Sequence, residues 1–127
     1  MDSRILVVND EVDLLAACAL VLESAGYAAE TLSDGTKARE RVEAFRPDVV
    51  LLDWVLGGTQ GDIVLQDLRK HYGPSPRIIV MSALPDLRSR ALELGADDFL
   101  QKPFDEDRLL SAIGAHTKAR TMQTRTG

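Results

Sequence analysis

Five short runs of apolar residues recur along the chain, and a stretch with helical spacing of its apolar positions follows each run. The runs are rich in Val, Ile and Leu, which is typical of strands buried on both faces of a sheet. We expect strands at residues 5–8, 27–32, 49–52, 78–81 and 98–101. Between them, apolar residues repeat at i, i+3 or i+4, and i+7, a spacing that predicts helices. These helices are expected at about 11–25, 36–45, 62–72, 86–94 and 105–118.

Strands that alternate with helices predict an α/β fold with a doubly wound, five-stranded parallel sheet and helices on both faces. Turn-forming residues support the boundaries: Gly26 follows the first helix, and Ser33 to Gly35 read as a turn. One domain is expected over residues 1–118, because no internal repeat or second core is apparent. Residues 119–127 are polar and basic and are expected to form a frayed tail or the start of a linker.

Composition narrows the possible functions. The chain has 127 residues, 45% of them apolar, a formal net charge of −5 and a pI of about 4.9. This acidic balance argues against broad binding to nucleic acid or to anionic membranes, both of which require a basic surface. The single cysteine, Cys18, lies in an apolar helical stripe, so we expect a buried side chain, no internal disulfide and a reducing cytoplasmic location. The apolar residues 5–8 are too few for a signal peptide or a membrane span.

Polar residues follow four of the expected strands, at the point where each strand ends. Parallel strands bring their carboxyl ends to one edge of the sheet, where doubly wound folds place their functional sites. The residues expected at this edge are Asn9, Asp10 and Glu11, then Asp53, Ser82 and Lys102. Any one of them would be an ordinary strand end, but two groups of acids with a hydroxyl and a lysine form an unusual combination.

The residue types at this edge point to phosphoryl transfer. Asp10 and Asp53 offer the hard oxygen ligands that Mg²⁺ prefers. A carboxylate can also act as a nucleophile toward phosphorus, and Asp53 is placed for that role. Lys102 can neutralise a phosphoryl oxygen, and Ser82 can donate a hydrogen bond to another.

The sequence resembles the receiver domains of two-component response regulators, of the kind found in chemotaxis regulators. The resemblance covers roughly residues 3–116 and rests on "ILVVNDE", "PDVVLLDWVLGGTQG", "IIVMSA" and "GADDFLQKPF" with their spacings. It implies a flavodoxin-like (βα)5 fold with strand order 2-1-3-4-5. It also implies that a sensor histidine kinase or a phosphotransfer protein passes a phosphoryl group to Asp53, with Mg²⁺ as cofactor.

The resemblance assigns roles to further residues. For the metal it implies Asp10, Asp53, the backbone carbonyl of Val55, and Asn9 through a water molecule. For the phosphoryl group it implies Ser82, Lys102 and the backbone of Ala83. Ser82 and Phe99 would change rotamer together on activation, and the Lys102–Pro103 peptide bond would be cis. The domain would catalyse its own phosphorylation and dephosphorylation without being a conventional enzyme.

Two positions depart from the family pattern. The first member of the acidic pair is usually Asp and is here Asn9, whose amide can orient a water but supplies no charge. The loop after Asp53 usually carries Pro-Gly, whereas Gly57-Gly58 here should make it looser.

The resemblance also implies partners. These are an upstream kinase and a downstream effector domain or protein, or a second copy bound through the last strand and the last two helices, with no direct contact to nucleic acid or membrane. The exposed charges on that side also fit an ordinary solvated face; they are Arg88, Arg90, Glu106 and Arg108.

Three other interpretations compete with an active receiver. A nucleotide-binding flavodoxin-like protein is disfavoured, because the acids after the first strand would repel a phosphate. A phosphatase with an aspartate nucleophile would require a second acid two residues after Asp53, where Val55 stands. The remaining alternative is a degenerate receiver that binds proteins without phosphorylation, and only Asn9 supports it.

Overall fold

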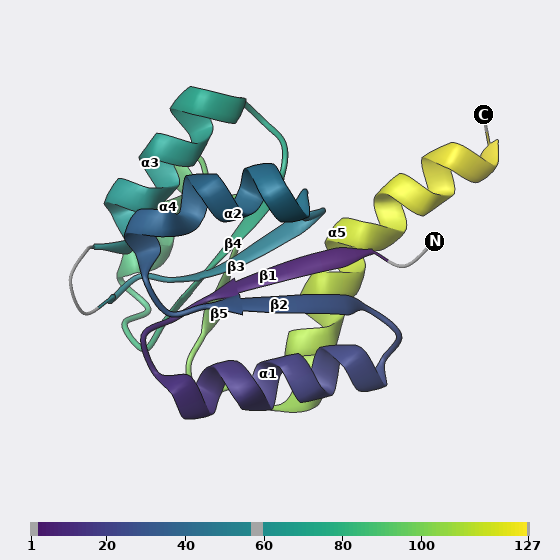
Figure 1. The fold of residues 1–127 in the computed structure, drawn as a ribbon, viewed down its shortest axis with the longest axis horizontal. Helices are drawn as coiled ribbons and strands as arrows, with labels where there is room; N and C mark the ends of the chain where they lie inside the picture. The colour runs from purple at the N-terminus through teal and green to yellow at the C-terminus, as the bar shows by residue number, and fades with distance from the viewer. Residues whose placement is uncertain (1–2, 57–59, 127) are drawn as a thin grey trace.

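The computed structural model describes residues 3–56 and 60–126, with side chains described up to residue 117. Five strands form one parallel sheet in the order β2-β1-β3-β4-β5, which confirms the predicted architecture (Figure 1). The strands are β1 (Arg4–Val8), β2 (Ala28–Leu32), β3 (Val49–Asp53), β4 (Arg77–Ser82) and β5 (Asp98–Gln101).

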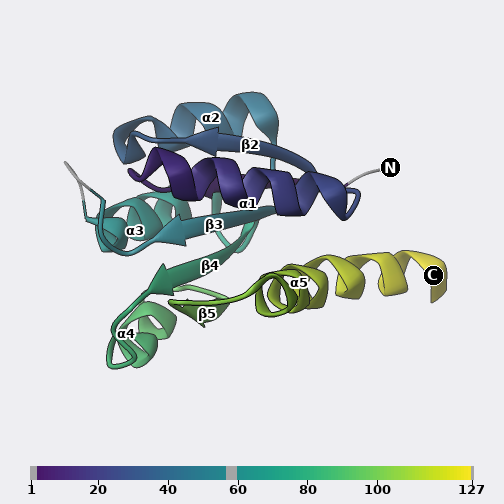
Figure 2. The same ribbon diagram turned by 90° about the horizontal axis from the view of Figure 1, so that it is seen from below.

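Helices cover both faces of this sheet (Figures 1 and 2). They are α1 (Val12–Ser24), the short 3-10 helix η1 (Gly35–Lys37), α2 (Ala38–Phe45), α3 (Gly61–Tyr72), α4 (Leu87–Glu93) and α5 (Glu106–Thr126). Helices α2, α3 and α4 pack on one face, and α1 and α5 pack on the other. Among the described residues, no helix is long and apolar enough to cross a membrane.

Alternation along the central strands produces two cores. In β1, Leu6 and Val8 face the α2–α3–α4 side, whereas Ile5 and Val7 face the α1–α5 side. Both sets are fully buried, which is why the strands read as continuous apolar runs. Cys18 is buried in the second core as predicted, and burial raises the pKa of its thiol, with a smaller opposing effect of Lys102.

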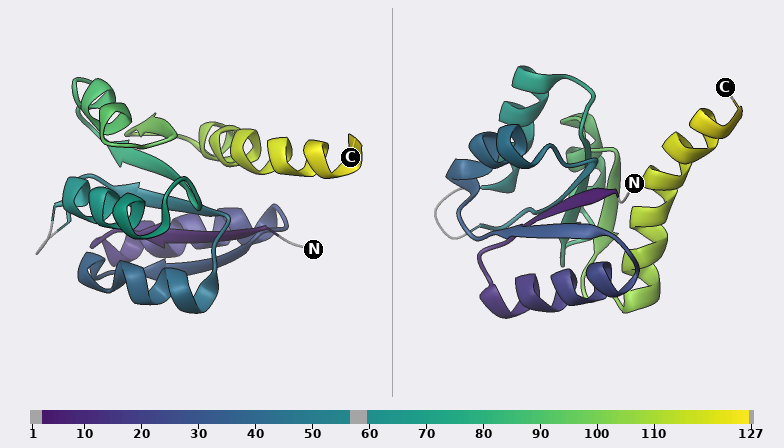
Figure 3. Two further views of the ribbon diagram at one scale, coloured as in Figure 1. Left: turned by 90° about the horizontal axis from the view of Figure 1, so that it is seen from above. Right: turned by 45° about the vertical axis from the view of Figure 1, so that its right-hand side comes forward.

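Two helix boundaries differ from the predictions. The helix expected at 36–45 begins with η1, because Asp34 accepts a hydrogen bond from the Thr36 backbone N–H at 3.0 Å and tightens the first turn. The last helix, expected to end at about residue 118, continues to Thr126 and projects beyond the sheet (Figure 3). Residues 119–126 include good helix formers and neither Gly nor Pro, so nothing in them ends the helix.

Candidate functional site

The carboxyl edge of the sheet gathers most of the buried polar side chains. Among the described residues, the buried polar or charged ones are Asn9, Asp53, Ser82 and Thr117. The first three follow or end β1, β3 and β4, where the sequence predicts a site. Burying polar groups costs free energy unless they are paired, so their concentration at one edge requires an explanation.

The strand ends bring these residues together through the backbone. The Trp54 N–H donates to the Met81 carbonyl at 2.9 Å, and the Lys102 N–H donates to the Ser82 carbonyl at 2.8 Å. These bonds continue the sheet pattern one step past β3 and β5. The side chains that follow the three strands therefore share one small area.

Asp53 is the centre of the arrangement and is only 3% exposed. Its Oδ2 forms an ion pair with the Lys102 ammonium and accepts a hydrogen bond from Asn9 Nδ2 at 2.5 Å. Its Oδ1 accepts a hydrogen bond from the Val55 N–H at 2.9 Å. The Asp53 carboxylate thus has three donors around it, and a carboxylate can act as a nucleophile toward phosphorus.

Lys102 supplies the positive charge of the site. Its ammonium lies 3.9 Å from Glu11 Oε1 in addition to its contact with Asp53. An ammonium has three N–H donors, so donors remain for another anionic group. The peptide bond between Lys102 and Pro103 is cis, as the resemblance to receiver domains implies.

Ser82 ends β4 and is 3% exposed. Its Oγ accepts a hydrogen bond from the Leu84 N–H at 3.0 Å. Because a hydroxyl is both acceptor and donor, this bond leaves the Ser82 hydrogen free to be donated to a ligand. Phe99, in the neighbouring strand β5, is buried in the core on the α2–α3–α4 side of the sheet.

Gly61 explains how α3 starts so close to Asp53. Its N–H donates to the Trp54 carbonyl at 2.7 Å, and a Cβ at this position would lie 2.6 Å from Trp54 Cα and collide with the Asp53 carbonyl oxygen. Only glycine allows that approach. The predicted looseness of Gly57-Gly58 lies outside the described residues.

The donor set fits Mg²⁺ by its chemistry. Among residues 3–56 and 60–126, no cluster of three or more His, Cys, Asp or Glu side chains could hold a metal ion. Mg²⁺ takes one or two carboxylates and completes its shell with waters and phosphate oxygens, so Asp10 and Asp53 would suffice with the Val55 carbonyl. Asp10 is exposed beside the site, where a carboxylate can meet a hydrated ion.

The structure brings together some predicted residues and not others. Asp53, Lys102 and Asn9 are in direct contact, whereas Asp10 and Ser82 lie around them without a hydrogen bond to Asp53 in the described part of the chain. Two backbone donors were not predicted from the sequence. They are the Val55 N–H, which donates to Asp53, and the Glu11 N–H, which donates to Asn9. Asn side chains often accept a hydrogen bond from the backbone N–H two residues later, so Asn9 could have indicated the Glu11 N–H as a donor.

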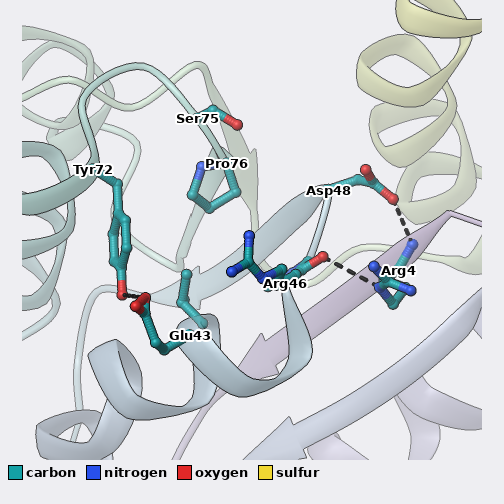
Figure 4. A pocket seen from close by; sticks show the side chains of 9 residues that line it. Arg4, Glu43, Arg46, Asp48, Tyr72, Ser75 and Pro76 are labelled. Carbon is teal, nitrogen blue, oxygen red and sulfur yellow. Dashed lines mark hydrogen bonds between the residues drawn. The ribbon is translucent and has the colours of Figure 1, made fainter.

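A pocket of about 370 Å³ lies at the opposite, amino edge of the sheet (Figure 4). Hydrogen bonds connect several of the residues that line it. The backbone N–H of Arg4 donates to Asp48 Oδ2 at 2.8 Å, and Arg4 Nε donates to the Arg46 carbonyl at 3.2 Å. The Tyr72 hydroxyl donates to Glu43 Oε2 at 2.8 Å. Burial raises the pKa of Tyr72, and the bond to Glu43 adds to this effect. These contacts join β1, α2, β3 and α3 and give the pocket a structural role.

Comparison with known proteins agrees with this arrangement. The family model of the response regulator receiver domain matches residues 5–114. The DNA-binding response regulator MtrA of Mycobacterium tuberculosis is 37% identical over 120 residues, covering 93% of this chain and 52% of MtrA. The nitrogen assimilation regulatory protein NtrX of Azorhizobium caulinodans is 35% identical over 113 residues, covering 87% of this chain and 25% of NtrX. The chain thus spans about half the length of MtrA and about a quarter of the length of NtrX.

Solved structures show the same fold. The receiver domain of NtrX from Brucella abortus superposes with a TM-score of 0.83 at 30% identity, covering 90% of this chain and 98% of that domain. The receiver domain of the Francisella response regulator 1452 superposes with a TM-score of 0.87 at 26% identity, covering 94% of this chain and 99% of that domain.

Proposed function

Because the chain belongs to the response regulator receiver domain family, we propose that it accepts a phosphoryl group on Asp53 from a sensor histidine kinase or a phosphotransfer protein. The observation that carries this proposal is the placement of Asp53. It is a buried carboxylate at the end of the central strand, in contact with a lysine whose ammonium retains donors.

In the proposed reaction, an Asp53 carboxylate oxygen attacks the phosphorus of the donor. An aspartyl-phosphate bond forms, and the bond from phosphorus to the leaving group breaks, with its electron pair going to the leaving group. The Lys102 ammonium donates to one phosphoryl oxygen and neutralises part of its charge. The Ser82 hydroxyl and the Ala83 N–H donate to the other phosphoryl oxygens. Mg²⁺ bound by Asp10, Asp53 and the Val55 carbonyl would neutralise charge on the phosphoryl oxygens.

The proposed output is a change at the face formed by α4, β5 and α5. Ser82 would turn toward the phosphoryl group, and Phe99 in β5 would repack with it. Leu92 and the arginines of α4 are exposed on this side, so a rearrangement there would be presented to an effector or to a second copy of the chain. The cytoplasmic location expected from the sequence stays a prediction.

Incubation with acetyl phosphate and Mg²⁺ tests the proposal. We expect a mass gain of one phosphoryl group in the unsubstituted protein and none in Asp53→Asn. A protein that gains no mass under conditions that label another receiver domain would instead support the degenerate alternative, a module that binds partners without phosphorylation.

A further inference from the structure

Asn9 is the most deeply buried polar residue of the site, with no exposed surface, and both ends of its amide are bonded. Its Oδ1 accepts a hydrogen bond from the Glu11 N–H at 2.7 Å, in the turn that leads into α1. Its Nδ2 donates to Asp53 Oδ2 at 2.5 Å. The side chain therefore links the start of α1 to the carboxylate of Asp53.

The two contacts require an amide at this position. The Glu11 N–H is a donor and needs an acceptor, whereas the ionised Asp53 carboxylate is an acceptor and needs a donor. An amide supplies one acceptor and one donor. Both partners are satisfied by the same orientation of the amide, with Oδ1 toward Glu11 and Nδ2 toward Asp53. An aspartate could accept from Glu11, but it would place a carboxylate oxygen against Asp53 where Asn9 now places an N–H.

We propose that Asn9 is a positioning residue, which holds the Asp53 carboxylate in place through its amide N–H when no metal is bound. The inference deepens the proposed function and rests on it for the role of Asp53 as acceptor. It differs from the predicted role of Asn9, in which the side chain would reach the metal through a water.

The neutral amide of Asn9 also affects the net charge that a Mg²⁺ ion would meet at the site. Asp10 and Asp53 would each bring one negative charge to the metal-free centre and Lys102 brings one positive charge, while Asn9 adds only a neutral donor. A divalent cation gains less on entering such a centre than on entering one with an additional carboxylate. We therefore expect Asn9→Asp to bind Mg²⁺ about tenfold more tightly than the unsubstituted protein.

Thermal unfolding in a chelator tests the contact between Asn9 and Asp53. Four proteins are compared: the unsubstituted protein, Asn9→Asp, Asp53→Asn and the double variant. Asn9→Asp keeps the acceptor for Glu11 and replaces only the donor to Asp53, so it should lower the melting temperature by about 5 °C. In an Asp53→Asn background the same substitution should cost less than about 2 °C, because the amide at position 53 can then donate to the carboxylate at position 9. Mg²⁺ should raise the melting temperature of Asn9→Asp more than that of the unsubstituted protein.

Gln101→Glu is the matched control, because it adds one negative charge on an exposed side chain at the same edge of the sheet. It should lower the melting temperature in chelator by less than Asn9→Asp does. Equal losses from Asn9→Asp in the two backgrounds would overturn the inference, as would an unchanged Mg²⁺ affinity. Failure of the unsubstituted protein to take a phosphoryl group would instead count against the proposed function, since unfolding in chelator involves no phosphorylation.

Discussion

Two ion pairs lie at opposite edges of the same sheet, and they use their positive charges differently. At the carboxyl edge, Lys102 contacts Asp53, and at the amino edge, Arg69 contacts Asp97 at 2.5 Å. Both cations are shielded from solvent, with side chains 22% and 15% exposed. Charge and the burial of the cation therefore do not separate a reactive site from a structural one in this molecule.

The hydrogen bonds do separate them. Arg69 Nε donates to the Gly95 carbonyl at 2.7 Å, and its Nη1 donates to the carbonyls of Gly73 and Pro76 at 3.1 and 2.7 Å. Asp97 Oδ2 in turn accepts from the Ile78 N–H at 2.8 Å. Four of the five guanidinium N–H groups are thus used within the protein, which ties the end of α3 to the starts of β4 and β5. The Lys102 ammonium, by contrast, donates one hydrogen bond, to Asp53, in the described part of the chain. Its other N–H donors can therefore bind an incoming anion.

Arg69→Ala should give the largest loss of stability. It removes the donors of three backbone carbonyls and leaves the Asp97 carboxylate with the Ile78 N–H, so we expect unfolding to become easier by about 3 kcal/mol. Urea unfolding measures this as a lower midpoint with an unchanged slope.

Arg39→Ala provides the control, because Arg39 and Asp67 form an ion pair in which both side chains are substantially exposed. Hydrogen bonding to Arg39 holds the pKa of Asp67 below its usual range. This pair therefore contributes above the unfolded-state pKa of Asp, about 3.9, and its contribution is lost as the pH falls through the lower folded-state value. Its removal should change stability much less than Arg69→Ala; equal losses would contradict the structural role given to Arg69.

Lys102→Ala should have a smaller effect on stability and a larger one on function. Asp53 keeps the N–H donors of Asn9 and Val55, so we expect a loss of about 1.5 kcal/mol, half that of Arg69→Ala. Uptake of a phosphoryl group from acetyl phosphate should slow about 100-fold, since one charged donor to the transferring group is gone. The same urea unfolding and a time course of intact mass give the two numbers. A variant that unfolds like Arg69→Ala yet is phosphorylated normally would reverse the assignment of the two edges.

Sequence patterns were sufficient for the sheet and for the expectation that Asp53 and Lys102 share one of its edges. The strands are fully buried, so their apolar runs are unbroken, and parallel pairing then fixes which residues share an edge. Asp53 and Lys102 could be brought together on that basis alone. The end of α5 was missed because a polar sequence without Gly or Pro is compatible with both a tail and a helix.

Other features could not be predicted because they depend on direction or on distant partners. An amide is both donor and acceptor, so the sequence does not say which end of Asn9 faces Asp53. Arg69 reads as a solvated residue in the last turn of a helix, and its partner Asp97 lies 28 positions away. Only the fold brings the two together.

An amide NMR spectrum with and without Mg²⁺ and beryllofluoride, which mimics a phosphoryl group, tests the central claim most directly. The account predicts that the backbone signals of Asn9, Val55, Leu84 and Lys102 shift on addition, while those of Gly73, Ile78 and Gly95 around Arg69 stay in place. It also predicts that Asp53→Asn abolishes the shifts. An unchanged spectrum, or shifts around Arg69 as large as those around Asp53, would contradict the assignment of a reactive carboxyl edge and a structural amino edge.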